Sequence, residues 1–537
     1  MALTKAHNRM IADAAVNVKD FGAVGDGVTD DTAAIQAALD SGASQIIFSS
    51  GTYLVRSVGT VTYDSVSFNY CLKIPSNITL KGLHTKSIIK LDDSQDAVVF
   101  VNSNFAGSNS RITLRDLYID GNSTNQTASF NKADGFLLNN IFNLEIIDCE
   151  VFQSAGYGFR LDTVQNFKYQ GLRVTTESVA NRDGCKLIDH RYGTISDCNF
   201  NTGDDGFSIT AYNRDVSNIS VSNIVSTSSL ARGFLINLHG TAEAAGTERT
   251  FSNINATGIT TRSCNGPSVL FEYGNYQNCN VQNVDDSSRC GLRIWLASAN
   301  VSGSLSNCSF DVVARNNTEE GILIKDLALG ETAFDNKLKA VIEDCGDGFH
   351  GIRIGFGSRW SVNAVVDYDP ANSKVSPTTA VACLASYSNL NLIVDKGVNN
   401  LFMSSGDYNT VTNGVFTNAT GGGLAAINIL SGSNNHTIVG NLVDKKINNA
   451  GSGSFISNNG GNSNKGTATF SGDSLTTTFN IPHGLPTTPT FWQVTPAAGG
   501  ARGDHYVTAS STNLTLNFNT APGTATNNIV VKWLAEI

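Results

Sequence analysis

The sequence has few charged residues, and this scarcity excludes one class of partner. Charged residues make up 15% of the chain, against roughly 25% in an average globular protein. Lys and Arg total 36 and Asp and Glu total 46, so the net charge is 36 − 46 = −10. A nucleic-acid-binding protein needs a basic surface to meet the phosphates, and we therefore expect no nucleic-acid partner.

Long apolar runs are also missing. Residues 1–20 carry Lys5, His7 and Arg9 without an apolar stretch, so they do not resemble a signal peptide. No segment approaches the roughly eighteen apolar residues of a membrane helix, and we expect no membrane insertion. Apolar residues still make up 41% of the chain, which is enough for a buried core. These patterns predict a soluble protein made in a cytosol, which another route of transport can take outside the cell.

The ten cysteines lack the paired spacing, such as Cys-x-x-Cys, that zinc sites use. Five of them directly follow an Asp or an Asn: Cys149, Cys198, Cys279, Cys308 and Cys345. Free Cys behaves as a small apolar residue, and disulfides are improbable in so large a chain without secretion signals. We expect a stacked column of buried thiols. Because no dense Asp/Asn/Gly calcium loop is visible, we also expect no metal and no cofactor.

A short repeated pattern is what the sequence has in abundance. A turn residue, a Gly and an apolar-variable-apolar triplet recur between residues 130 and 355. The copies are residues 134–138, 157–161, 183–187, 205–209, 232–236, 290–294, 320–324 and 350–354. Repeats of roughly 20–50 residues are typical of stacked architectures, in which each copy buries its apolar face only against its neighbours. Matching positions should then form columns along one side of the stack.

The spaces between the copies show no helical periodicity of roughly 10–15 residues, which disfavours βαβ folds and favours a parallel β-helix. We expect this all-β domain over residues 75–450 and an N-terminal cap over residues 16–74. In the cap, Thr29 is expected to begin a helix that ends at Leu39 and covers the open end of the stack.

The two ends of the chain differ from the repeats. Residues 1–15 are predicted to form a short polar helix or flexible arm. Residues 451–465 are rich in Gly, Ser and Asn and predict a linker. Residues 466–537 contain short alternating strands, which indicate a small C-terminal β-sandwich.

Three acidic residues are distinctive within the repeat. Asp183 and Asp205 precede the Gly in consecutive copies, and Asp204 comes directly before Asp205. Neighbouring coils lie about 4.8 Å apart, so the three carboxyls should share one patch and repulsion should raise one pKa. A protonated acid beside an ionised carboxylate is what glycoside hydrolysis requires. The competing interpretation is that Asp-Gly is a common turn dipeptide, as Asp134 with its following Gly illustrates.

The variable position of the triplet should point outward, and it often carries a cation. It holds Arg160, Lys186, Ser208, Arg293 and Arg353. A ladder of cations would suit an anionic saccharide, although ordinary solvated strand residues are the plainer interpretation. Tyr212, His239, Glu272 and Trp295 lie just past their triplets and could line a groove, where an exposed Trp can stack on a sugar ring. The candidate substrate-binding residues are Lys186, Arg232, His239, Glu272, Arg293 and Trp295.

Residues 16–55 carry a family likeness, in the run Val-Lys-Asp-Phe-Gly-Ala-Val-Gly-Asp-Gly from Val18 and in Gly-Thr-Tyr-Leu from Gly51. They resemble the opening of pectate-lyase-superfamily chains, and most of all bacteriophage tailspikes that depolymerise bacterial surface polysaccharides. The resemblance implies a right-handed single-stranded parallel β-helix, a homotrimer, and attachment to a phage tail or baseplate protein through the N-terminus. Many such chains carry a longer N-terminal adaptor, so the mode of attachment is open. The C-terminal sandwich is similar to their terminal modules for trimerisation or carbohydrate binding.

A second likeness concerns the acidic residues. The stretches Asn181-Arg182-Asp183 and Gly203-Asp204-Asp205 resemble motifs of polygalacturonase-type inverting hydrolases. The likeness implies that one residue of the Asp pair is the acid and that the other carboxylates activate water. Arg232 stands where that family has the His of a Gly-His-Gly, and residues 269–272 lack its Arg-x-Lys. A preference for uronates is therefore not carried over.

The sequence thus predicts an endo-acting glycoside hydrolase of the phage tail, made in the host cytoplasm, that depolymerises a capsule, exopolysaccharide or O-antigen. Its catalytic residues would be Asp183, Asp204 and Asp205. The alternative enzyme is a polysaccharide lyase, with Lys186, Arg232, His239 or Tyr212 as its base or cation. A spike that binds polysaccharide without cutting it is a third interpretation, and a cleft between subunits is a fourth.

Overall fold

The computed structural model describes residues 15–127, 133–176, 182–325, 332–346, 349–367, 379–395, 399–417, 426–443, 445, 447–457, 459, 463–485 and 487–536. The chain divides into two compact units, residues 1–337 and 338–537, and each is described by itself. Of the arm expected over residues 1–15, all but Ala15 lies outside the described residues. Within the described ranges, no helix has the length and apolar character needed to span a bilayer.

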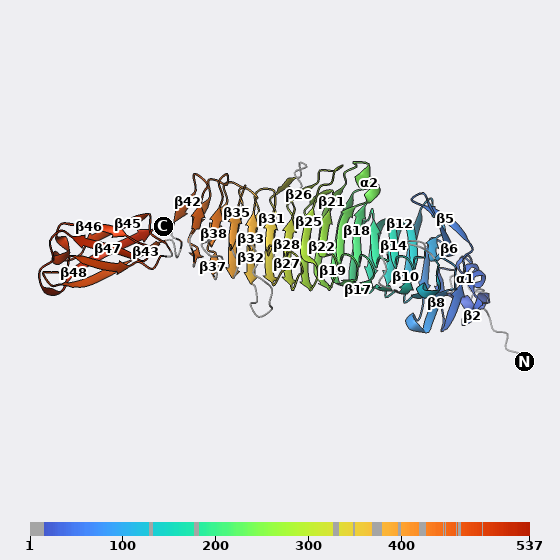
Figure 1. The fold of residues 1–537 in the computed structure, drawn as a ribbon. Helices are drawn as coiled ribbons and strands as arrows, with labels where there is room; N and C mark the ends of the chain where they lie inside the picture. Colours follow the sequence, from blue (N-terminus) through green and yellow to red (C-terminus); the bar gives the residue numbers. More distant parts are fainter. Residues whose placement is uncertain are drawn as a thin grey trace, which may run out of the picture. The chain divides into compact units, whose positions relative to one another are not determined.

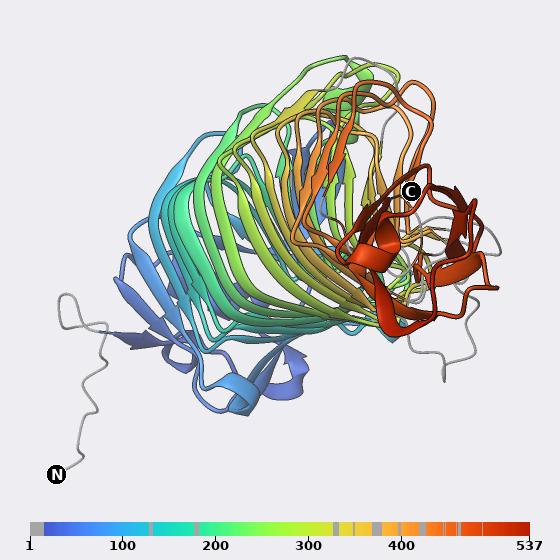
Figure 2. The same cartoon turned by 90° about the vertical axis from the view of Figure 1, so that its left-hand side faces the viewer.

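The first unit is a stack of coils whose strands pair in parallel with those of neighbouring coils (Figures 1 and 2). We call one row of strands the site face: β9 (Ala97–Asn102), β12 (Phe136–Ile147), β14 (Phe159–Gln170), β16 (Cys185–Ile188), β18 (Phe207–Ala211), β20 (Phe234–Leu238), β22 (Pro267–Glu272), β25 (Cys290–Trp295) and β28 (Ile322–Ile324). The expected parallel β-helix is confirmed.

Two further rows complete each coil. The second row contains β3 (Gln45–Ile47), β7 (Ile78–Lys81), β10 (Asn109–Arg115), β17 (Arg191–Thr202), β19 (Val216–Ser228), β21 (Thr250–Arg262), β24 (Asn280–Asp286) and β27 (Ser309–Arg315). The third row contains β4 (Gly51–Val55), β8 (Ser87–Leu91), β11 (Tyr118–Asp120), β13 (Glu150–Ser154) and β15 (Arg173–Thr176), and it continues through the later parts of β17, β19, β21, β24 and β27. The short strands β23 (Asn275–Gln277), β26 (Ser304–Ser306) and β29 (Thr332–Phe334) follow the first residues of β21 and belong to the second row.

The core of the stack comes from the repeated triplets. The first apolar residue of each triplet is buried, and where two neighbouring triplets both begin with Phe the two rings stack. The ring centroids of Phe136 and Phe159 are 5.1 Å apart, and those of Phe207 and Phe234 are 5.0 Å apart. Cys185 takes the matching place between Phe159 and Phe207. All ten cysteines are buried free thiols, so the expected burial of the thiols is confirmed.

The Gly of the repeated pattern is required by the close approach of neighbouring coils. A Cβ on Gly184 would collide with the carbonyl oxygen of Gly206. The Gly184 N–H donates to the carbonyl of Asp205 at 2.9 Å, and the Gly206 N–H donates to the carbonyl of Arg232 at 3.0 Å. This ladder stacks the residues that precede each Gly into one column, which we call the pre-Gly column.

The N-terminal cap differs from expectation at the start of its helix. Its elements are β1 (Val16–Asn17), the 3-10 turn η2 (Val18–Phe21), β2 (Asp26–Asp30) and α1 (Thr32–Leu39). Thr29 does not cap α1, because Asp26 accepts hydrogen bonds from its N–H at 2.7 Å and its hydroxyl at 2.9 Å and so holds it in β2. Asp31 directly precedes the helix, but its carboxylate accepts from the N–H groups of Val24 and Gly25.

One element departs from the coil pattern. Strands β5 (Gly59–Tyr63) and β6 (Val66–Ile74) form an antiparallel hairpin before β6 pairs in parallel with β9. Asp64 and Ser65 have φ values of 46° and 63°, the positive values that a tight two-residue hairpin turn requires. We refer to these strands as the β5–β6 hairpin.

The second unit contains further parallel coils and two antiparallel sheets. The coil strands are β31 (Ile352–Ile354), β32 (Ser361–Asp367), β33 (Val381–Cys383), β34 (Asn389–Asp395), β35 (Leu401–Met403), β36 (Thr410–Thr412), β37 (Val415–Thr417), β38 (Ile427–Ile429), β39 (Thr437–Val439), β40 (Leu442–Val443), β41 (Ile447–Asn449) and β42 (Phe455–Ser457), with β30 (Lys337–Glu343) starting at the unit boundary. The antiparallel strands are β43 (Ser463–Gly472), β44 (Thr478–Pro482), β45 (Phe491–Pro496), β46 (His505–Ala509), β47 (Asn513–Phe518) and β48 (Ala525–Glu536).

The antiparallel strands form two three-stranded sheets, β43-β48-β45 and β44-β47-β46. Their shared core includes Ile481, Leu514, Leu516, Ile529 and Val531. The linker expected over residues 451–465 contains regular structure, because β42 pairs with β39 and β43 begins before the linker's predicted end.

Candidate active site

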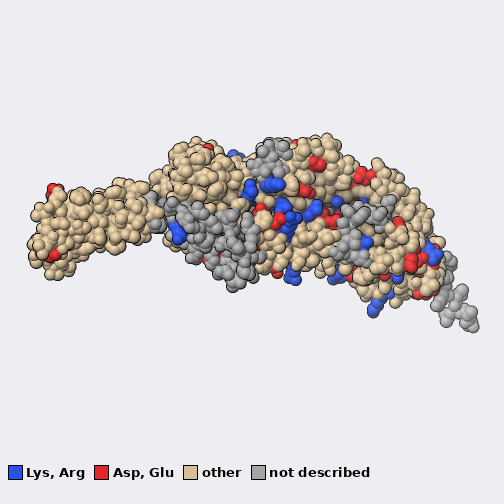
Figure 3. All heavy atoms as spheres, in the orientation of Figure 1, with Lys and Arg blue, Asp and Glu red and all other residues tan. Residues whose placement is uncertain are grey.

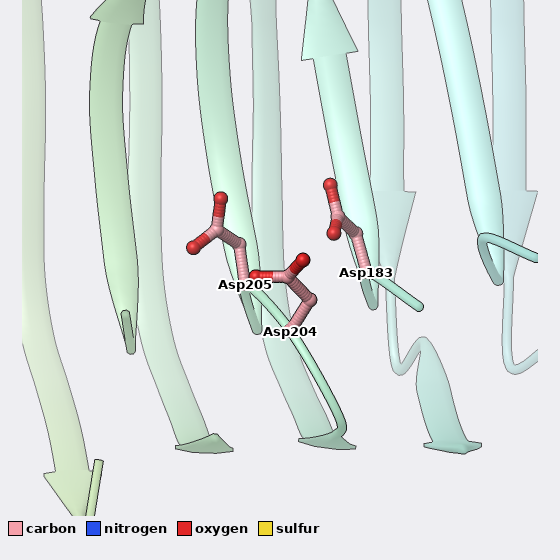
Figure 4. A group of neighbouring side chains, drawn as sticks. All are labelled: Asp183, Asp204 and Asp205. Atoms are coloured by element: carbon pink, nitrogen blue, oxygen red, sulfur yellow. The ribbon is translucent and has the colours of Figure 1, made fainter. Parts of the chain in front are cut away.

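Three carboxylates meet where two neighbouring strands of the site face begin (Figure 4). Asp183 lies just before β16, and Asp204 and Asp205 lie just before β18. One oxygen of each carboxylate lies within 4.8 Å of the others. Asp183 is 3% exposed and Asp205 is 6% exposed, while Asp204 is half-buried. The structure therefore brings together the three acidic residues that the repeat pattern placed in one patch, and we call them the acidic cluster.

Hydrogen bonds fix the backbone that carries the Asp pair. The carbonyl oxygen of Asp204 accepts from the hydroxyls of Thr202 at 2.8 Å and Ser228 at 2.6 Å. Its N–H donates to the carbonyl of Arg182 at 3.3 Å. Both neighbouring coils thus hold the turn on which Asp204 and Asp205 stand.

Turn chemistry explains part of the pre-Gly column. The carboxylate of Asp134 accepts from the N–H of Tyr157 at 2.8 Å, and that of Asp205 accepts from the N–H of Arg232 at 3.3 Å. In both cases the donor is the pre-Gly residue of the next coil. Asp183 instead faces the ammonium group of Lys186 at 3.9 Å. The interpretation as turn residues therefore has a structural basis at Asp134 and Asp205, whose carboxylates accept from the next coil. Asp183 departs most from that pattern, and this supports its interpretation as a catalytic residue.

The electrostatics of the acidic cluster favour a shared proton. Burial, together with the charges of Asp205 and Asp204, raises the pKa of Asp183 to about 8, against the opposing effect of Lys186. Burial also raises the pKa of Asp205, while the guanidinium of Arg232, 3.2 Å away, opposes that rise. Coupled carboxyls lose their protons in steps that belong to the group as a whole. Near neutral pH the cluster therefore retains a proton that it can donate.

The cations beside the acidic cluster are engaged by carboxylates of the protein. Arg232 lies between Asp205 and Glu272, with its Nη2 3.9 Å from the Glu272 carboxylate. The guanidinium of Arg293 lies 2.6 Å from Glu319. Burial raises the pKa of Glu272, and Arg232 offsets part of that rise. Both guanidinium groups on this part of the site face are therefore paired with carboxylates of the protein.

The expected ladder of cations is interrupted. In register from coil to coil, the variable positions are Arg160, Lys186, Ser208, Leu235, Leu270 and Arg293. Two Leu residues therefore separate Ser208 from Arg293: Leu235 is the variable residue of the copy 232–236, and Leu270 lies on a coil without a copy of the pattern. Arg160 is 7% exposed and pairs with Asp134 at 2.9 Å. Arg353 lies in β31 of the second unit.

The four residues just past their triplets lie at the ends of site-face strands. The rings of Tyr212 and His239 pack in a tilted arrangement with their centroids 4.3 Å apart. His239 caps the short helix α2 (Gly240–Ala244), and burial lowers its pKa. Glu272 and Trp295 are register partners on β22 and β25. One face of the half-buried Trp295 ring is already covered by the ammonium of Lys325, 4.1 Å from its centroid.

Sequence reasoning missed the aromatic residues on the N-terminal side of the acidic cluster. Tyr157 occupies the pre-Gly column between Asp134 and Asp183, and its ring lies 3.9 Å from the Arg160 guanidinium. Tyr63, from the β5–β6 hairpin, donates to Asp162 at 2.8 Å across 99 residues of sequence. The alternating residues around the Asp64-Ser65 turn could have predicted a hairpin, but not where it docks.

Among the residues that the structure describes, the acidic cluster is also the group whose carboxylate oxygens lie close enough to one another to hold a metal ion. Lys186 and Arg232 lie within 4 Å of two of its three carboxylates. Two positive charges at that distance disfavour a divalent cation. The arrangement suits the sharing of a proton better than the binding of a metal.

Comparison with known proteins indicates which class of protein this chain resembles. Residues 15–260 match the profile of the family described as "Rhamnogalacturonase A/epimerase, pectate lyase-like". The matched segment includes the acidic cluster, Lys186 and Arg232, and it ends before Glu272, Arg293 and Trp295. The match and the parallel β-helix together support the expected likeness to pectate-lyase-like chains.

Individual relatives cover a limited part of the chain. Mannuronan C5-epimerase AlgE5 of Azotobacter vinelandii is 34% identical over 218 residues, which is 37% of this chain and 20% of that protein. Alginate lyase 7 of the same organism is 31% identical over 216 residues, 37% of this chain and 24% of that protein. The chain thus matches about a fifth to a quarter of these relatives. Among solved structures, the Pseudomonas phage phi297 tailspike gp61 has a TM-score of 0.44 at 10% identity, over 98% of this chain and 99% of that one.

Proposed function

We propose that this protein hydrolyses the glycosidic bonds of a polysaccharide, with Asp183 as the acid and Asp204 and Asp205 as the carboxylates that activate water. The observation that carries the proposal is the pair of environments around Asp183 and Asp205. Asp183 is buried and has a pKa of about 8, so it is mostly protonated at neutral pH. Burial raises the pKa of Asp205 as well, but a guanidinium at 3.2 Å and an N–H at 3.3 Å oppose that rise and favour its ionised form. Environments that favour the proton on one carboxyl and the charge on its neighbour are typical of acid and base partners.

The chemical step follows from these roles. Asp183 gives its proton to the glycosidic oxygen as the bond between that oxygen and the anomeric carbon breaks. Asp204 or Asp205 takes a proton from the water whose oxygen bonds to the anomeric carbon. One proton leaves the acidic cluster and one enters it, so its total protonation is unchanged. Likeness to polygalacturonase-type enzymes would place the acid within the Asp pair. We assign it to Asp183 because its cation is farther away than that of Asp205.

Lysis by β-elimination is the second candidate, because two relatives are named as a mannuronan epimerase and an alginate lyase. That chemistry needs a base for the proton beside a uronate carboxylate and a cation for the carboxylate itself. Arg232 and Arg293 already face carboxylates of the protein at 2.6–3.9 Å. A uronate would have to compete for them, and this favours hydrolysis.

The biological setting that we propose is a bacteriophage tail. A homotrimer attached through its N-terminus would degrade a capsule, exopolysaccharide or O-antigen on the host surface. The resemblance of residues 16–55 to tailspike openings supports this setting. Light scattering checks the assembly, and a monomer mass in solution would contradict the trimer.

Purified capsular polysaccharides from several bacterial strains, together with polymannuronate, test the reaction class. Hydrolysis predicts new reducing ends without the ultraviolet absorbance of an unsaturated sugar, whereas elimination produces both. Asp183→Asn should slow product formation by roughly 10²–10⁴-fold. Asp134→Asn, in the same pre-Gly column, should retain activity in the protein that folds. Full activity of folded Asp183→Asn would remove Asp183 from the mechanism, and binding of a polysaccharide without any cleavage would favour the non-cutting spike.

A further inference from the structure

The β5–β6 hairpin reaches across the site face to the coils that carry the acidic cluster. At its tip, Tyr63 donates a hydrogen bond to Asp162 of β14 at 2.8 Å. The neighbouring residue Asp64 accepts one from the hydroxyl of Tyr212, just after β18, also at 2.8 Å. The hairpin is therefore held at two points, on either side of the strand β16 that follows Asp183.

The underside of the hairpin is apolar and covers an outward column of the site face. Val61 and Phe68 pack in one cluster with Val101 and Leu137. Val101 and Leu137 are register partners, and Leu137 is the partner of Arg160 on the next coil. Both are 0% exposed, although their column would otherwise face solvent. Each such buried side chain contributes roughly 1.5–3 kcal/mol, so this cover is firmly attached.

The cover continues over Arg160 and ends at the next coil. The Arg160 guanidinium lies 3.9 Å from the Tyr157 ring centroid, 5.2 Å from that of Phe68 and 5.8 Å from that of Tyr63. These rings occupy the space in which a sugar would bind. The next residue of the column is Lys186, which is half-buried and belongs to the same coil as Asp183. Along the column of variable residues, the cover therefore ends at the coil that supplies the proposed acid, while Asp64 at the tip reaches Tyr212 just after β18.

On the other side of the acidic cluster, polar side chains are accessible over several coils. The side chain of Arg232 is 30% exposed, that of Glu272 is 19% exposed and that of Arg293 is 16% exposed. Trp295 and Lys325 follow at the far end. Figure 3 shows charged side chains gathered over the strands β18–β28. Five strand spacings separate β16 from β28, about 24 Å at about 4.8 Å each, which is enough for an oligosaccharide.

We propose that the β5–β6 hairpin closes the substrate site at its N-terminal end, so that the enzyme cuts from a chain end. A linear polymer lying along the coils from Trp295 to Asp183 meets Tyr157, Arg160 and the hairpin on the next coil and cannot continue. The chain end binds against this wall, and each cut releases a short product of fixed length. The inference rests on the proposed function and replaces the endo mode that the sequence suggested.

The test follows the time course of cleavage of the purified capsular polysaccharide that gives product in the assay above. For the wild-type protein we expect one dominant product size from the earliest time points, with reducing ends accumulating well before viscosity falls. Capping both ends of the polymer with a bulky fluorophore should reduce the initial rate at least tenfold. The double substitution Tyr63→Ala and Asp64→Ala removes both attachments of the tip. The double variant should release a broader range of product sizes than the wild type. At the same concentration of reducing ends, its reaction mixture should have a lower viscosity than that of the wild type.

Tyr387→Ala, at an exposed Tyr of the second unit, is the matched control and should behave like wild type. The wild-type measurements decide the matter even if the double variant folds poorly. An early collapse of viscosity with few reducing ends, or no effect of capping the polymer, would overturn the closed end and leave hydrolysis intact. Unsaturated products of a single size would support the closed end and overturn hydrolysis. Failure to cleave any polymer would overturn the proposed function and this inference with it.

Discussion

Asp183→Asn removes a carboxyl that the fold makes difficult to ionise. The pKa of Asp183 is about 8, against an ordinary value of 3.8, because the group is buried beside two other carboxylates. Each pKa unit corresponds to about 1.4 kcal/mol, so ionising Asp183 costs the folded protein on the order of 5 kcal/mol relative to the unfolded chain. Asn has a similar shape and no charge, and it avoids this cost.

The size of the effect on stability depends on pH. The pKa in the folded protein lies above that of the unfolded chain, so the wild type is fully stable with respect to this group below about pH 4. It loses that stability as the pH rises towards 8. Asp183→Asn should therefore unfold near the wild-type temperature at pH 4 and at a clearly higher temperature at pH 9. Its rate of hydrolysis should fall by roughly 10²–10⁴-fold, because the acid is missing.

Thermal unfolding of both proteins from pH 4 to pH 9, with activity measured in parallel, checks this prediction. Asp285→Asn is a suitable control, because Asp285 is a buried carboxyl on β24 whose pKa burial raises to about 6. Its effect on stability should change between pH 4 and pH 6, and its activity should be retained. A stability difference for Asp183→Asn that stays constant across the pH range would refute the argument from burial.

Three further predictions concern the groups around the acidic cluster. Arg232→Gln removes the cation 3.2 Å from Asp205, so the acidic limb of the pH profile of kcat/KM should move to higher pH; an unchanged limb would contradict the pairing. Arg160→Met leaves Asp134 buried without its partner, so we expect a loss of about 3–5 kcal/mol in unfolding free energy, measured by chemical denaturation; an unchanged unfolding free energy would contradict the buried pairing. EDTA should leave the rate of hydrolysis unchanged, because Lys186 and Arg232 disfavour a metal ion, and a loss of rate that a divalent cation restores would show otherwise.

The repeat in the sequence was sufficient to predict the fold and the acidic cluster. The Gly positions are required by the contact between neighbouring coils, and the inward Phe positions by the stacking of rings, so both recur at readable intervals. Asp183 and Asp205 come together for the same reason, since they precede two of those Gly residues. Local hydrogen bonding also limited the prediction, because Asp26 holds Thr29 in a strand and delays the helix.

Features without a repeated signal could not be predicted. The interruption of the cation ladder at Leu270 depends on the register of a coil that lacks the repeated pattern, whereas Leu235 stands in the regular copy 232–236. The partners of Arg160 were hidden for a different reason, because Tyr63 and Phe68 reach it from a hairpin that lies far earlier in the sequence. Their contacts depend on how a local hairpin packs on a distant surface, and the amino-acid pattern of neither segment specifies that packing.

The order of synthesis has a consequence for the β5–β6 hairpin. Residues 59–74 leave the ribosome before β12 and β14, which form part of the surface that they cover, and long before Tyr212, which holds the tip. Until those coils have been added, Val61 and Phe68 face water or any other apolar surface in the cell. A nascent chain that stalls before Tyr212 has been made therefore exposes an apolar hairpin whose tip lacks one of its two attachments, and chaperones and proteases can recognise it.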